Sequence, residues 1–155
     1  MLRDLDPLLT PELLYVLAAM GHGDEVVVCD ANFPAESVAL TTPHGSVVRL
    51  AGADAPAAAR AILSVLPLDE FVETPVLRME VVDSPAEIPA VQRDVQELVD
   101  GAAGRPLPMG SLERHAFYET AARAYAVVAT GERRFYGNFV FKKGVVGAPS
   151  AGSEA

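Results

Sequence analysis

The sequence is poor in the side chains that most often bind metals. It has one cysteine, Cys29, and three histidines, His22, His44 and His115, among 155 residues. Their scattered spacing fits no metal-ligand motif, so we expect no metal site. Cys29 lies in an apolar run, which predicts a buried, reduced thiol and a cytoplasmic protein. The P-loop, G-x-G-x-x-G, G-x-S-x-G, H-E-x-x-H and EF-hand patterns are also missing, which argues against the classes that those motifs mark.

Basic residues and long apolar runs are scarce as well. The chain has 12 Lys and Arg against 21 Asp and Glu, a net charge of −9. Binding to nucleic acid or to an anionic membrane requires clustered basic residues, so neither partner is expected. No apolar run approaches the ~20 residues that span a bilayer. The first six residues include two acids and precede no apolar segment, so we expect no signal peptide. The net charge of −9 favours a neutral or weakly charged small ligand.

What the chain does have is enough apolar residues, 50% of the total, for one sizeable core. We expect a single domain over 1–146 and a disordered tail over 147–155. Alternating helix and strand patterns predict an α/β sandwich. A hairpin between the last two strands of a mixed sheet is one arrangement that the turn at 131–134 allows.

The elements are predicted from capping residues, apolar periods and proline or glycine breaks. Thr10 and Pro11 are typical of a helix start, and Gly21 of its end. Further helices are expected after Asp54, after Pro89 and over 114–124. Strands are expected over 25–29, 46–50, 76–82, 111–113, 126–130 and 139–143, with loops over 31–43 and 101–110.

His22 lies between two glycines, at the head of the buried strand 25–29, and Asp30 follows the tail of that strand. A histidine has an ordinary pKa near neutrality and can both donate and accept a proton. Ligands of open α/β sheets bind beyond the carboxyl ends of strands, so Asp30 and the loop 30–34 are expected to line a pocket. The alternatives are a solvent-facing histidine at a helix end and a carboxylate that caps its own turn. The two groups need not share one pocket within a subunit.

A second group of candidates lies near the C-terminus. Arg114 and Tyr118 are four residues apart and share a helical face, where a guanidinium and a phenol could bind a polyol. The alternative is a surface arginine stacked on a tyrosine. Tyr136, Gly137 and Asn138 then offer a hydroxyl, close backbone approach and an amide, although a plain turn has the same composition.

Taken together, these segments resemble the fucose mutarotase and ribose pyranase family. The similarity runs in order over about residues 2–145. The matching blocks are Leu9-Thr10-Pro11-Glu12-Leu13-Leu14, Met20-Gly21-His22-Gly23-Asp24-Glu25, Asp30-Ala31-Asn32-Phe33-Pro34, Leu66-Pro67-Leu68-Asp69, Phe117-Tyr118-Glu119, Ala129-Thr130-Gly131-Glu132, Tyr136-Gly137-Asn138 and Lys142-Lys143-Gly144. Arg114 and the Phe117-Tyr118-Glu119 block are closer to the fucose branch than to the ribose branch.

The resemblance implies a three-layer α/β/α sandwich with a mixed, mostly parallel sheet, and an enzyme that needs no cofactor. It implies a ring-shaped homo-oligomer, often a decamer, with sites at subunit contacts. By position, His22, Tyr118 and Tyr136 fall on the catalytic residues. The expected substrate-binding residues are Asp30, Asp69, Arg114, Gly137 and Asn138.

The function implied is interconversion of the α and β anomers of a pyranose, most closely L-fucose. A ribose pyranase, which exchanges pyranose and furanose forms, is the alternative enzyme. A non-catalytic sugar-binding protein and a scaffold ring with an empty site are the alternatives of other classes. A sugar and further copies of the chain are the expected partners.

Overall fold

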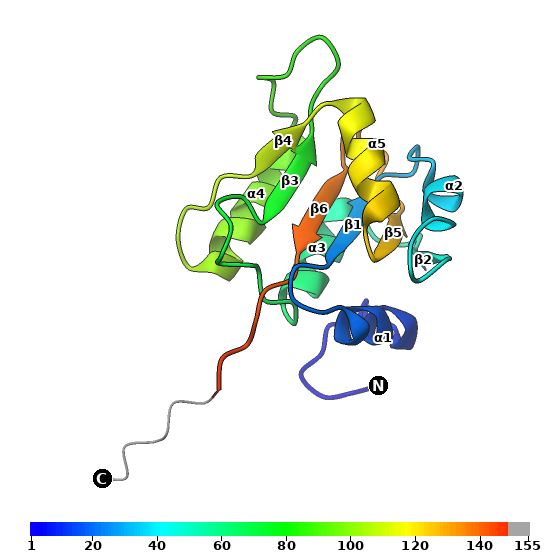
Figure 1. The fold of residues 1–155 in the computed structure, drawn as a ribbon, viewed down its shortest axis with the longest axis vertical. Coiled ribbons are helices and arrows are strands. Elements are labelled where there is room, and N and C mark those ends of the chain that lie inside the picture. Colours follow the sequence, from blue (N-terminus) through cyan, green and yellow to red (C-terminus); the bar gives the residue numbers. More distant parts are fainter. Residues whose placement is uncertain (149–155) are drawn as a thin grey trace.

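The computed structural model describes residues 1–148, which form a six-stranded sheet with helices on both faces (Figure 1). The strands are β1 (Glu25–Cys29), β2 (Val47–Leu50), β3 (Val76–Met79), β4 (Gly110–Leu112), β5 (Ala126–Thr130) and β6 (Phe139–Lys142). The helices are α1 (Pro11–Ala19), α2 (Ala35–Ala39), α3 (Ala55–Leu63), α4 (Ala90–Ala103) and α5 (Arg114–Arg123). The predicted α/β class is confirmed. Residues 149–155 of the predicted tail lie outside the described residues.

The strand order is β2-β5-β1-β6-β3-β4. β1 pairs in parallel with β5, β5 with β2, and β3 with β4, whereas β6 runs antiparallel to both of its neighbours, β1 and β3. The sheet is therefore mixed and mostly parallel. The hairpin between β5 and β6 is wrong, because β1 lies between them. The segment 131–138 instead crosses the end of β1, where Ala31 donates its N–H to the carbonyl of Glu132 at 2.9 Å.

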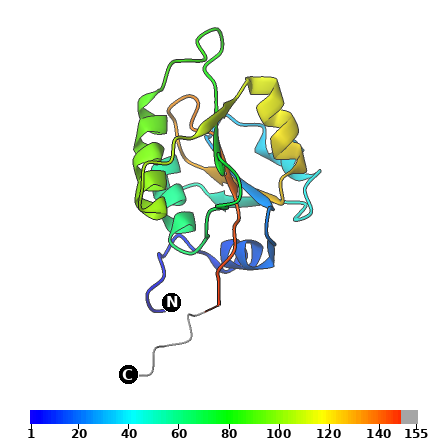
Figure 2. The same cartoon turned by 60° about the vertical axis from the view of Figure 1, so that its left-hand side comes forward.

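Alternate residues of each central strand point into two separate cores. Val26 and Val28 of β1 face a core shared with α1, α3 and α4, and Val27 and Cys29 face a second core shared with α2 and α5. Figure 2 shows α3 and α4 on one side of the sheet and α5 on the other. Since both faces are covered, β1 is almost wholly apolar, as is typical of a central strand in an α/β fold.

Helix α1 begins where the sequence predicts. The Thr10 hydroxyl accepts a hydrogen bond from the N–H of Leu13 at 3.2 Å, and Pro11 occupies the first turn. The helix ends at Ala19. Gly23 then adopts a φ of 86°, a conformation that glycine tolerates, and the chain enters β1. His22 is consequently held in a short turn at the amino end of the central strand.

Three elements differ from the sequence prediction by more than one residue. α2 forms inside the predicted loop 31–43; with only five residues it is too short to show a helical period, and buried Ala35 and Ala39 hold it against the sheet. α4 continues through Gly101 and ends at Ala103, and Gly104 forms the C-cap with a φ of 69°. β3 stops at Met79 because the chain turns back on itself, with Asp83 at a φ of 61°.

Candidate functional site

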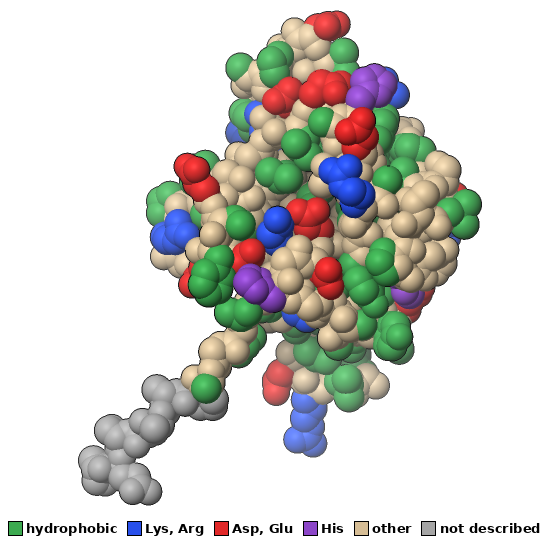
Figure 3. Space-filling model, in the orientation of Figure 1, with side chains coloured by type: hydrophobic (Ala, Val, Ile, Leu, Met, Phe, Trp, Pro, Cys, Tyr) green, Lys and Arg blue, Asp and Glu red, His purple; other side chains and the backbone are tan. Residues whose placement is uncertain are grey.

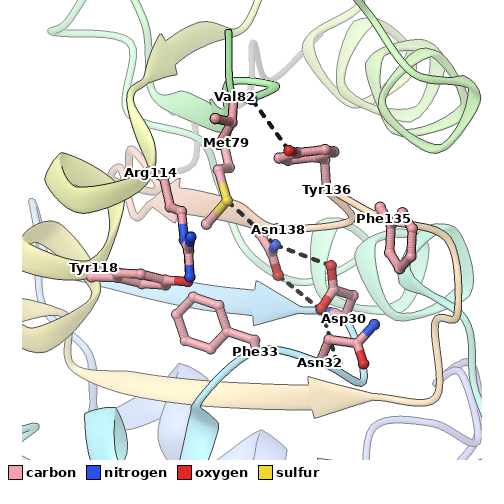
Figure 4. Close-up of a pocket in the computed structure, with 10 residues that line it drawn as sticks. All are labelled: Asp30, Asn32, Phe33, Met79, Val82, Arg114, Tyr118, Phe135, Tyr136 and Asn138. Carbon is pink, nitrogen blue, oxygen red and sulfur yellow. Dashed lines mark hydrogen bonds between the residues drawn. The ribbon is translucent and has the colours of Figure 1, made fainter.

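A pocket opens at the carboxyl ends of β1 and β3, between the first turn of α5 and the segment 131–138. Its cavity of about 260 Å³ is small beside the ~300–1,000 Å³ of typical ligand sites and suits a small molecule. Figure 4 shows the ten lining residues, which come from four separate segments of the chain. They are Asp30, Asn32, Phe33, Met79, Val82, Arg114, Tyr118, Phe135, Tyr136 and Asn138.

Asp30 forms the buried polar floor of the pocket with Asn138. The Asn138 amide donates to Asp30 Oδ2 at 3.1 Å, and its Oδ1 accepts the N–H of Asp30 at 2.9 Å. Asn32 donates its N–H to the other carboxyl oxygen at 3.0 Å. Asp30 is only 4% exposed, and burial raises the pKa of its carboxyl above the ordinary value despite these hydrogen bonds. A carboxyl in this state can exchange a proton closer to neutral pH than an ordinary aspartate.

Tyr136 forms the rim of the pocket in a constrained backbone conformation. Its φ is 64°, unusual for any residue other than glycine, and its hydroxyl accepts the N–H of Val82 at 3.2 Å. Gly137 follows because a side chain there would not fit: an added Cβ would lie 2.9 Å from the Cγ of Glu132. The Tyr136-Gly137-Asn138 turn is therefore more than a plain connection, since it delivers a phenol and an amide to one cavity.

Arg114 and Tyr118 lie on one face of α5, as their spacing predicts. The guanidinium Nε donates to the phenolic oxygen of Tyr118 at 2.9 Å, and this bond raises the pKa of Arg114. Glu113 caps the helix by accepting the N–H groups of the next turn. Figure 4 shows the Arg114–Tyr118 pair on one side of the pocket and the Asp30–Asn138 pair on the other. The pair thus offers directed donors to a ligand as well as a surface contact.

An apolar wall completes the cavity, and most of it was not anticipated. The ring of Phe33 packs against that of Tyr118, with centroids 5.5 Å apart. Met79, Val82 and Phe135 also line the cavity. Only Phe33 lies in the loop that was expected to form a pocket wall. Met79 ends a strand at the same edge as Asp30, a position that could have singled it out; Val82 and Phe135 carry no such signal.

His22 and Asp69 lie at the opposite end of β1. The Nε2 of His22 is 3.1 Å from Asp69 Oδ1, and its ring centroid is 5.4 Å from that of Phe71, a side chain 75% exposed. Burial alone would raise the pKa of the Asp69 carboxyl, but the hydrogen bonds from Phe71 N–H and from His22 lower it. Within the chain, Asp69 therefore holds the imidazole, and Asp30 does not.

His22 and Asp30 cannot meet within one chain. The five residues of β1 rise about 3.3 Å each, so about 16 Å of strand separates them. Of the predicted site residues, Asp30, Arg114, Tyr118, Tyr136 and Asn138 line one cavity with Gly137 behind them, and His22 and Asp69 form a second cluster. The remaining histidines lie outside the pocket lining: His44 bonds Glu12 at 3.1 Å and His115 packs beside Tyr118.

No group of three or more potential metal ligands, and no helix long and apolar enough to cross a membrane, occurs within residues 1–148. The face shown in Figure 3 carries acidic, basic and apolar side chains interspersed with one another.

A family model described as the RbsD / FucU transport protein family matches residues 3–146. The chain belongs to this family. Human fucose mutarotase is 45% identical over 148 residues, 94% of each chain. The crystal structure of FucU from Bifidobacterium longum matches with a TM-score of 0.85 at 41% identity, covering 92% of this chain and 99% of that one. Fucose mutarotase from Streptococcus pneumoniae, solved in complex with L-fucose, matches with a TM-score of 0.84 at 37% identity over 94% and 100%.

Membership confirms the family predicted from the sequence blocks, including the closer likeness to the fucose branch. It also covers both clusters described above, because the match runs from before His22 to beyond Asn138.

Proposed function

We propose that this family member is an L-fucose mutarotase that interconverts the α and β anomers without a cofactor. The observation that carries the proposal is the convergence of Asp30, Asn138, Arg114, Tyr118 and Tyr136 on one small cavity. Several fixed donors and acceptors around a small cavity suit a molecule with hydroxyls on most of its carbons, and relatives at about 40% identity are named for this reaction.

Mutarotation requires two proton transfers. A base removes the proton of the anomeric hydroxyl, the bond from C1 to the ring oxygen breaks, and an acid delivers a proton to that oxygen. Closure on the other face of the aldehyde reverses both transfers and gives the other anomer. The residues needed are one acid, one base and groups that hold the remaining hydroxyls, each proton-transfer group contributing roughly 10²–10⁴-fold in rate.

We assign one proton-transfer role to His22, held by Asp69, and the other to the tyrosines of the pocket. Asp30, Asn138 and Arg114 hold sugar hydroxyls. Because His22 lies about 16 Å of strand away from Asp30, its role requires that a second copy bring its His22 end against the pocket. The proposed site is therefore shared between subunits.

Exposed aromatic side chains at both ends support this assembly. Phe71 lies beside His22 and is 75% exposed, while Phe135 at the pocket rim is 73% exposed. Contact between the two different ends of successive copies is a head-to-tail interface, which forms a ring when the rotation between copies closes. Such a contact would bury the phenyl rings of Phe71 and Phe135. We therefore propose a ring-shaped homo-oligomer, and the family resemblance implies a decamer as its size.

The apolar wall bears on the choice of sugar. L-Fucose carries a methyl group beyond its ring, whereas the pyranose form of ribose has no carbon substituent there. Phe33, Met79 and Val82 offer an apolar surface for such a methyl group. This favours the mutarotase over the ribose pyranase.

We also place the reaction in the cytoplasm, in line with the single free thiol of Cys29.

The test is exchange NMR on the L-fucose anomers with wild type and His22→Ala, repeated with D-ribose. We expect wild type to accelerate fucose exchange and His22→Ala to lose most of the effect. Faster exchange of ribose forms alone would favour the pyranase. Stabilisation of the fold by fucose without faster exchange would indicate a sugar-binding protein. If neither sugar stabilises the fold or exchanges faster, the scaffold ring is favoured.

A further inference from the structure

A buried glutamine on α4 holds two residues of the pocket from behind. Gln92 is fully buried and does not line the cavity. Its Nε2 donates to the carbonyl of Met79 at 2.7 Å and to that of Tyr136 at 3.0 Å. One amide group therefore joins the end of β3 to the segment that carries Tyr136.

Arg78 fixes the orientation of that amide. The residue is 7% exposed, and its Nη1 donates to Gln92 Oε1 at 3.1 Å. A guanidinium has only donors, so it must face the oxygen of the amide, which turns the amide N–H groups toward the two carbonyls. No ion pair involving Arg78 occurs within residues 1–148. A buried arginine without a carboxylate partner is uncommon, and holding this amide gives it a role.

Arg78 also contacts the connection that binds the phenol of Tyr136. Its Nη2 donates to the carbonyl of Pro85 at 3.1 Å, in the connection between β3 and α4. That connection carries Val82, whose N–H bonds the Tyr136 hydroxyl. Tyr136 is thus held at its carbonyl and at its phenol by one set of contacts that begins at Arg78, and its φ of 64° shows that it needs such support.

We propose that Gln92, oriented by Arg78, is a positioning residue that sets the place of the Tyr136 phenol in the pocket during turnover. Gln92 acts through Tyr136 and touches no sugar. The inference rests on the proposed function, because it assumes that Tyr136 takes part in the anomer exchange.

The experiment compares Gln92→Met with a matched control, Gln96→Met. Gln96 lies one turn further along α4 and also binds backbone groups, the carbonyl of Leu107 at 2.8 Å and the N–H of Met109 at 2.9 Å. Within residues 1–148 it makes no hydrogen bond to Met79 or Tyr136. We expect Gln92→Met to lower kcat for L-fucose exchange by about 10- to 100-fold with a smaller change in KM, since small misplacements of a reacting group cost this much. Gln96→Met should keep kcat within about twofold, measured well below its unfolding temperature.

Two further variants separate positioning from folding. Gln92→Glu keeps an acceptor for Arg78, but an ionised carboxylate cannot donate to the Tyr136 carbonyl, so kcat should fall while the fold is retained by circular dichroism. Gln92→Met is then repeated in a Tyr136→Phe background. If Gln92 acts through the phenol, the second loss should be at least fivefold smaller than in wild type.

Equal loss of kcat in the Gln92→Met and Gln96→Met variants, or full additivity with Tyr136→Phe, would overturn the inference and leave the proposed function in place. A wild-type protein that does not accelerate fucose exchange would overturn both.

Discussion

The two ends of β1 are built differently although both carry predicted site residues. At the carboxyl end, Asp30 is buried, and its carboxyl accepts hydrogen bonds from Asn138 and Asn32. At the amino end, His22 is partly exposed, with Asp69 as its hydrogen-bond partner and an exposed phenyl ring beside it. The buried hydrogen-bond network of Asp30 suits binding of a ligand. The half-exposed His22 with its partner Asp69 suits contact with a second molecule. In the proposed function, the chemistry of one site is divided between these two surfaces.

The largest expected effect comes from the open end. His22→Ala should lower the rate of L-fucose exchange by about 10²–10⁴-fold, because it removes a proton-transfer group. The free energy of unfolding should fall by about 1 kcal/mol or less, since the His22 side chain is half exposed and Asp69 keeps the N–H of Phe71. Exchange NMR and urea denaturation measure the two quantities. A large loss of stability with normal exchange would break the contrast between the ends.

The buried end should respond in the opposite way. Asp30→Ala leaves the buried amide of Asn138 without its carboxylate acceptor, and a buried unsatisfied group costs about 1–3 kcal/mol. We expect a loss of stability in that range together with loss of fucose binding, measured by urea denaturation and calorimetry. The matched control is Asp24→Ala, whose carboxylate, among the described residues, bonds only the exposed N–H of Gly21; its stability should stay nearly unchanged.

The contribution of Glu132 to the stability of the fold should depend on pH. Burial alone would raise its pKa, but hydrogen bonds from Arg134 and from the N–H of Ala55 lower it. A lowered pKa in the folded state means that its stabilising contribution is present above the ordinary glutamate value near 4.5 and is lost as pH falls through the lowered pKa. Unfolding free energies between pH 7 and pH 3 should therefore converge for wild type and Glu132→Gln at the acid end. A difference that stays constant over this range would contradict the sign.

The smallest effect on the chain itself is expected at Phe71. Phe71→Ser removes an exposed ring, so the stability of the fold should change by less than about 0.5 kcal/mol. If the amino end contacts the pocket of another copy, the same change should shift light-scattering profiles toward smaller assemblies. The control is Tyr15→Ser, an exposed aromatic on α1, which should leave the assembly intact. Equal assembly of both variants would argue against this end as the interface.

Features set by local sequence could be predicted. The Thr10 cap, the apolar β1 strand and the Arg114–Tyr118 face depend on neighbouring residues, and all appear as expected. Features set by long-range pairing could not. The insertion of β1 between β5 and β6 depends on strands about a hundred residues apart in the chain.

The site divides in the same way. Asp30 could be placed at a pocket because it follows a buried strand. The partnership of His22 with Asp69, and that of Gln92 with Arg78 and Tyr136, join residues on separate elements, and no local pattern marks them. The apolar period of α4 does not single out position 92, because Gln92 is polar. The structure nevertheless buries it fully.

Subunit mixing tests the division of the site most directly. His22→Ala is refolded together with the double variant Arg114→Ala/Tyr136→Phe, each inactive alone in L-fucose exchange. If His22 serves the pocket of a second copy, mixed assemblies contain sites in which both halves are intact, and about a quarter of wild-type activity should return at a 1:1 ratio. Activity that stays at the level of the separate variants, in assemblies shown to contain both chains, would contradict a site shared between subunits.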